Sequence, residues 1–257
     1  MSTSDMTEVP AQAGALSVAG TAEDRLYLID ILTGRGNSYR MFSRLFFKPL
    51  TTEEIEDLAA TDYITIAQSL KEDSPEEPNL LAEGFNDMGR DLRKRHTGTR
   101  QLLSTDYTMC FDGVDVYEGQ VAVPYASVFL GKEELLNQEP QHQVYRIFKS
   151  ESLGLKSGVD LPEDHLSFEL EFLGILSDRA AQALEQDNAQ EAIRNLELSR
   201  DFIVDNILTW FDLLTERANK ILKTRFYRGV LKATKGYLEL DLATIEDLIE
   251  VIEHGEA

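Results

Sequence analysis

The chain has 257 residues and carries 46 acidic side chains against 25 basic ones, for a formal net charge of −21. So negative a surface repels nucleic-acid backbones and anionic membrane faces, which excludes nucleic acid as an expected partner and favours cationic ones. No apolar run approaches the roughly 20 residues needed to cross a bilayer, so stable membrane insertion is not expected. The charge by itself is equally consistent with a role in solubility alone.

The single cysteine, Cys110, excludes an intramolecular disulfide and fits a reducing compartment. The first 20 residues contain Asp5 and Glu8 but no Lys or Arg, so they lack the positive start of a secretory signal peptide. They are rich in small and polar residues. We therefore expect a cytoplasmic protein whose residues 1–22 form a flexible, acidic tail.

Apolar side chains recur at spacings of three and four residues through the first half of the chain, which predicts α-helices. A basic run at residues 93–96 falls at the expected end of one of them, where cations match the helix dipole; an anion or nucleotide site is the alternative. Only residues 121–125 have strand character, and Pro124 interrupts them. The predicted helices are residues 26–46 (loosened at Gly34 and Gly36), 51–58, 63–70, 80–92, 101–111 and 144–148.

The second half carries the strongest helical patterns. The helix near residues 166–180 has two apolar stripes, one from Leu166 and one through Phe168, Phe172 and Ile175, so we expect it to be central. Further helices are predicted at residues 193–214 (in one or two pieces), 226–238 and 242–252. The predicted fold is all-α: one globular, bundle-like domain of about ten helices at residues 23–253. It is divided into an N-terminal layer (23–150), a hinge loop (151–162) and C-terminal helices (163–253).

Standard catalytic signatures are absent from the sequence: there is no phosphate-binding glycine loop, nucleophile elbow, cysteine pair or zinc-type histidine spacing. The one segment that gathers residues able to carry chemistry is residues 160–166. Asp160 and Glu163 have capping-box spacing around Pro162, which suits a first helical turn, and Asp164 suits the positive helix end. Partner binding by this segment is a second hypothesis. A metal or acid–base pair of His165 with Glu169, four residues later, is a third.

Several motifs, in order along the chain, resemble those of the TorD/DmsD/NarJ family of redox-enzyme maturation chaperones. The segment at residues 162–173 resembles the family's Pro-Asp-His hinge motif, with Glu163 inserted. Ala126 and Asn206 depart from the residues usual in the family, Glu and His respectively. The motifs are Asp106-Tyr107-Thr108 before Phe111, residues 124–130, residues 162–173, and the aromatic residues Phe202, Trp210, Phe226 and Tyr227.

The resemblance implies a cytoplasmic chaperone, not an enzyme, that binds the twin-arginine signal peptide or the apo form of a molybdenum-containing oxidoreductase. Carboxylates would pair with the arginines, and a groove between helices would hold the apolar middle of the peptide. The expected binding residues are Asp164, His165, Pro162, Tyr125 and Ser127. No cofactor is expected, GTP being suggested by the resemblance alone, and the chain is expected to be a monomer or dimer.

Two other functions stay open at this point. One is a NarJ-like assembly chaperone, which attends a catalytic subunit that is not exported. The other, from a different class, is a metal- or nucleotide-dependent hydrolase.

Overall fold

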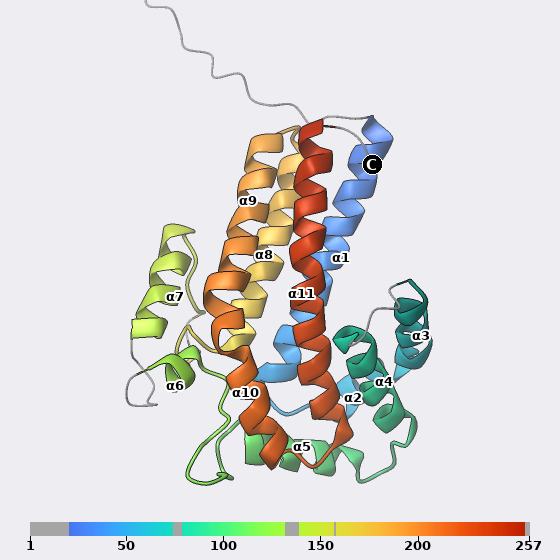
Figure 1. Ribbon diagram of the computed structural model, residues 1–257, viewed down its shortest axis with the longest axis vertical. Coiled ribbons are helices and arrows are strands. Elements are labelled where there is room, and N and C mark those ends of the chain that lie inside the picture. Colours follow the sequence, from blue (N-terminus) through green and yellow to red (C-terminus); the bar gives the residue numbers. More distant parts are fainter. Residues whose placement is uncertain (1–20, 74–78, 132–138, 157, 255–257) are drawn as a thin grey trace, which may run out of the picture.

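The computed structural model describes residues 21–73, 79–131, 139–156 and 158–254, and every regular element within them is helical (Figure 1). This confirms the all-α prediction. The predicted tail lies outside the described residues except for its last two positions. The elements are α1 (Ala22–Phe47), α2 (Thr52–Ala60), α3 (Tyr63–Asp73), α4 (Leu80–Arg93), α5 (Thr99–Cys110), α6 (Ala126–Leu130), α7 (Glu139–Ser150), α8 (Leu166–Glu185), α9 (Ala189–Phe202), a π-helical turn (Ile203–Ile207), α10 (Leu208–Ile221) and α11 (Arg225–His254).

Helices α1, α8, α9 and α11 run side by side as the long part of the molecule (Figure 1). Helix α8 packs along α1 on one side and along α9 on the other, so the prediction of a central helix is confirmed. Its two apolar stripes suit this position, because a helix that is apolar on two sides packs against neighbours on two sides. No helix within the described residues combines the length and hydropathy that a membrane crossing requires.

Helix α1 is continuous, although Gly34 and Gly36 were expected to loosen its middle. Thr21 and Asp24 form a capping box at its start. Gly36 instead allows close approach to α8: a Cβ atom built on Gly36 would lie 3.4 Å from the carbonyl oxygen of Gly174 and 3.0 Å from Oδ1 of Asp178. Packing against α8 therefore outweighs the low helix propensity of glycine.

Helix α11 spans the region where the sequence predicts two helices, at residues 226–238 and 242–252. That division is wrong, because no residue between them breaks the helix and Asp241 lies buried in its interior. Glycines bring α11 against α4 with the backbones touching. A Cβ atom on Gly84 would lie 2.3 Å from the amide nitrogen of Ala233, and one on Gly236 would lie 2.3 Å from that of Leu81.

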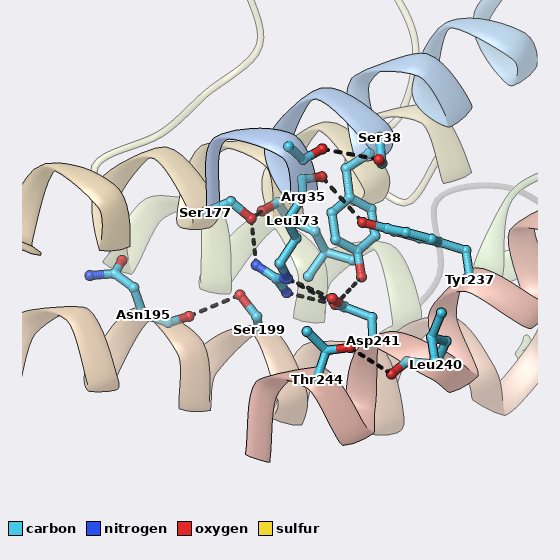
Figure 2. A network of polar contacts seen from close by, with 12 residues as sticks. Arg35, Ser38, Leu173, Ser177, Asn195, Ser199, Tyr237, Leu240, Asp241 and Thr244 are labelled. Carbon is cyan, nitrogen blue, oxygen red and sulfur yellow. Dashed lines mark hydrogen bonds and ion pairs between the residues drawn. The ribbon is translucent and has the colours of Figure 1, made fainter. Parts of the chain in front are cut away.

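A buried ion pair joins α1 to α11 (Figure 2). Arg35 donates through Nε to Oδ1 of Asp241 at 2.7 Å and through Nη2 to Oδ2 at 2.8 Å. The hydroxyl of Tyr39 donates to the same carboxylate at 2.5 Å, and Nη1 of Arg35 reaches Oγ of Ser177 on α8. Burial and the charge of Asp241 raise the pKa of Tyr39 well above its ordinary value, so it stays a donor. The network fixes three helices in one register.

Candidate functional site: an apolar groove at the start of α8

The segment before α8 is not the first turn of that helix. Helix α8 begins at Leu166, with His165 as its N-cap, and the imidazole Nδ1 accepts the amide of Ser167 at 3.2 Å. The predicted cap at Asp160, with Pro162 in the first turn, is therefore wrong. Backbone pairing explains the difference: the amide of Leu166 donates to the carbonyl of Pro124 at 2.9 Å, which holds His165 in an extended conformation after a turn at residues 163–164.

Asp164 is fully buried at the junction between this segment and α6. Its Oδ2 accepts the amide of Ser127 at 2.8 Å, and its carbonyl accepts the amide of Ala126 at 3.1 Å. Burial raises the pKa of the carboxyl group. The carboxylate thus anchors the start of α6 rather than the start of α8, and in this conformation it is out of reach of a peptide in solvent.

The predicted binding residues from the two motifs do come together. Tyr125 and His165 form an isolated backbone bridge, and their rings meet edge to face with centroids 4.7 Å apart. Burial lowers the pKa of His165 to about 4, so its ring is neutral at pH 7. Ser127 is fully buried and Pro162 is half-buried. Their arrangement is that of a packed junction, and their contact with a partner stays a prediction.

Glu169 does not pair with His165, although the two are four residues apart. Its side chain is fully buried, and neither carboxylate oxygen has a hydrogen-bond partner within the described residues. Burial and the nearby Asp164 raise its pKa well above the ordinary value. Nδ1 of His165 is occupied by Oγ of Ser167 at 2.7 Å. Across the described residues no cluster of three or more His, Cys, Asp or Glu side chains could hold a metal ion.

An apolar groove lies immediately beside this junction. It is a cavity of about 520 Å³ between the second half of α1, the loop after α7 and the first turns of α8. Phe47 and Phe168 contact each other across it, with ring centroids 6.0 Å apart. The lining residues, here called the α1–α8 groove, are Arg40, Ser43, Arg44, Phe47, Phe148, Leu153, Gly154, Leu155, Lys156, Val159, Ser167, Phe168, Glu171, Phe172 and Ile175.

The resemblance implies a groove between helices, but the motifs do not place it between α1 and α8. The signal was present in the second apolar stripe of α8, Phe168, Phe172 and Ile175, which was interpreted as a packing surface only. Of these three, Phe172 is buried, whereas Phe168 and Ile175 keep part of their surface exposed in the groove. The loop that closes the groove falls within the predicted hinge, residues 151–162, whose role as a hinge stays a prediction.

An all-helical protein with an apolar groove between helices has the features of a peptide-binding protein of the helix-in-groove kind. The family model of the nitrate reductase delta subunit matches residues 74–216, which include the motifs at 106–111, 124–130 and 162–173. The chain therefore belongs to this family of redox-enzyme maturation chaperones, as the motifs predicted.

Curated relatives agree with this assignment. The chain is 30% identical over 212 residues to the chaperone protein TorD of Aliivibrio fischeri, covering 81% of this chain and 93% of the relative. It is 26% identical over 209 residues to TorD of Vibrio parahaemolyticus, with the same coverage of both chains. With TorD of Vibrio atlanticus it shares 27% identity over 207 residues, or 80% of this chain and 92% of the relative. These relatives are named chaperones rather than enzymes.

Proposed function

We propose that this protein acts in the cytoplasm and binds the twin-arginine signal peptide of an apo molybdenum-containing oxidoreductase in the α1–α8 groove. Binding delays export until the cofactor is inserted and the client is assembled. The single observation that carries the proposal is the apolar groove itself, with Phe47, Phe168 and Ile175 partly exposed along its walls. The chaperone needs no cofactor for this task.

The groove suits the apolar middle of a signal peptide in size and character. Each large apolar side chain that leaves water contributes about 1.5–3 kcal/mol. The groove has room for a few such side chains. Part of the free energy that they contribute offsets the entropy lost on association. We therefore expect an affinity in the micromolar range, about −8 kcal/mol. Binding at that strength protects a leader peptide and still allows its release.

The predicted binding residues support peptide binding indirectly, because they position the groove wall. They are Asp164, His165, Pro162, Tyr125 and Ser127. The bonds between residues 124–127 and 164–166 fix the first turn of α8, and Ser167 and Phe168 of that turn line the groove. His165 also contacts Phe168 directly, with ring centroids 5.6 Å apart. Substitutions in the motif would therefore change the affinity for the peptide by displacing the groove wall.

Calorimetry with a synthetic twin-arginine leader peptide tests the proposal. Phe168→Ala removes one wall of the groove and should weaken binding about tenfold, since it deletes roughly one apolar anchor. Leu240→Ala on α11, where the side chain is 49% exposed outside the groove, is the matched control and should bind as the wild type does. Absence of binding by the folded wild-type protein would overturn the proposal, as would an unchanged affinity in folded Phe168→Ala.

A second candidate function is assembly of a catalytic subunit that is not exported, because the matching family model is that of the nitrate reductase delta subunit. The same groove would then hold an apolar segment of that subunit. Affinity purification of the tagged chaperone from its native cells separates the two. The captured enzyme either carries a twin-arginine leader or lacks one.

A further inference from the structure

Four charged side chains line the α1–α8 groove, and two of them are already neutralised by ion pairs. Arg44 makes a two-pronged contact with Glu54, through Nε and Nη2 at 2.5 Å each. Arg40 pairs with Asp178 on α8. Glu171 and Lys156, by contrast, make no ion pair or side-chain hydrogen bond within the described residues. They are therefore the charges available to a bound peptide.

Glu171 occupies an unexpected position for an acid. It lies three residues after Phe168 and four before Ile175, so it shares the groove face of α8 with both. Its side chain is half-buried among these apolar walls. A carboxylate there loses part of its hydration, which makes an opposite charge from a ligand more valuable than at an open surface.

Lys156 differs from Glu171 in its exposure and in its location. It is exposed and lies on the loop after α7, so it keeps its water and gains little from a counter-charge. The net charge of −21 also repels acidic peptides and attracts basic ones. Of the two charges, Glu171 is therefore the one that gains more from an opposite charge on a ligand.

We propose that Glu171 pairs with a cationic side chain of the bound peptide, beside the apolar segment that fills the groove. This inference rests on the proposed function and deepens it by naming the residue that selects for charge. The groove then discriminates between apolar segments: those flanked by a cation bind, whereas neutral or acidic ones bind less tightly. An arginine would suit the site best, because its guanidinium forms two parallel hydrogen bonds with a carboxylate.

The experiment measures the affinity of two peptides, the twin-arginine leader and the same leader with both arginines replaced by glutamine. Glu171→Gln should weaken binding of the arginine peptide about tenfold and leave the glutamine peptide unchanged. The matched control is Glu185→Gln, which removes the same charge from an exposed position at the end of α8, outside the groove. Measurement at low and high salt separates local pairing from long-range attraction.

Each outcome decides the matter. Equal effects of Glu171→Gln and Glu185→Gln would show that net charge alone is sensed and would overturn the inference. Lys156→Gln should bind the arginine peptide as well as the wild type or more tightly. If Lys156→Gln loses affinity for the peptide while Glu171→Gln keeps it, the inference is overturned, because the groove then binds an acidic segment. If the wild-type protein binds both peptides equally, only the inference about Glu171 is overturned. If it binds neither peptide, the proposed function is overturned as well.

Discussion

The buried ion pair between Arg35 and Asp241 makes a quantitative prediction about stability. Asp241→Leu removes the acceptor of three guanidinium hydrogen bonds and of the bond from the Tyr39 hydroxyl. Arg35, only 4% exposed, is then left with Ser177 as its partner and with no counter-charge. Leaving one member of a buried ion pair uncompensated costs about 3–5 kcal/mol.

The size of this loss can be checked against a compensated variant. For a chain of this length each kcal/mol lowers the melting temperature by roughly 2–4 °C, so Asp241→Leu should melt about 6–20 °C below the wild type. The triple variant Arg35→Met, Tyr39→Phe, Asp241→Leu also removes the two side chains that donate hydrogen bonds to the lost carboxylate. It should recover most of the loss, because a buried pair replaced by apolar groups of similar size is close to neutral.

Urea unfolding followed by circular dichroism measures both variants, and the slope of free energy against urea shows whether unfolding stays two-state. If Asp241→Leu lowers the free energy of unfolding by less than about 1 kcal/mol, the reasoning is refuted, because an uncompensated buried guanidinium should destabilise the fold by more than that. A triple variant as unstable as the single one would also refute it, because packing rather than charge would then explain the loss.

Two further predictions concern glycines and pH. Gly84→Ala should destabilise the protein by about 1–3 kcal/mol or more, since its Cβ would meet the α11 backbone, whereas Gly34→Ala, with nothing within 4 Å, should stabilise it by about 0.5–1 kcal/mol; urea midpoints compare them. Burial raises the pKa of Glu169, so above pH 4.5 the folded state binds more protons at this carboxyl than the unfolded state does, and this group's contribution to stability should fall as pH rises. The stability gained by Glu169→Gln should therefore be larger at pH 8 than at pH 5; an equal gain at both ends would contradict this.

Much of the fold was predictable because helical periodicity is a local property of the sequence. The two stripes of α8 correctly placed that helix at the centre, and the ordered motifs correctly predicted the family. The start of α8 was mistaken because Asp160 and Glu163 carry a local capping signal. The bond from Leu166 to Pro124 that overrides it is not local.

The parts that the sequence did not reveal depend on contacts between distant residues. Arg35 and Asp241 are 206 positions apart, and nothing in their neighbouring residues marks them as partners. The groove depends on where α1 and the loop after α7 stand relative to α8, so Phe168 and Ile175 could not be distinguished from core residues. Glu171 falls within the motif at residues 162–173, and its place within an apolar stripe was the available signal.

The distance along the chain between Arg35 and Asp241 also bears on biosynthesis. During translation, α1 and α8 emerge and can begin to pack before the carboxylate that neutralises Arg35 has been made. Until α11 is complete, the α1–α8 interface encloses a guanidinium without its counter-charge, and its closed form is disfavoured. Because α1 and α8 form two walls of the groove, peptide-binding competence should appear only in a chain translated through α11.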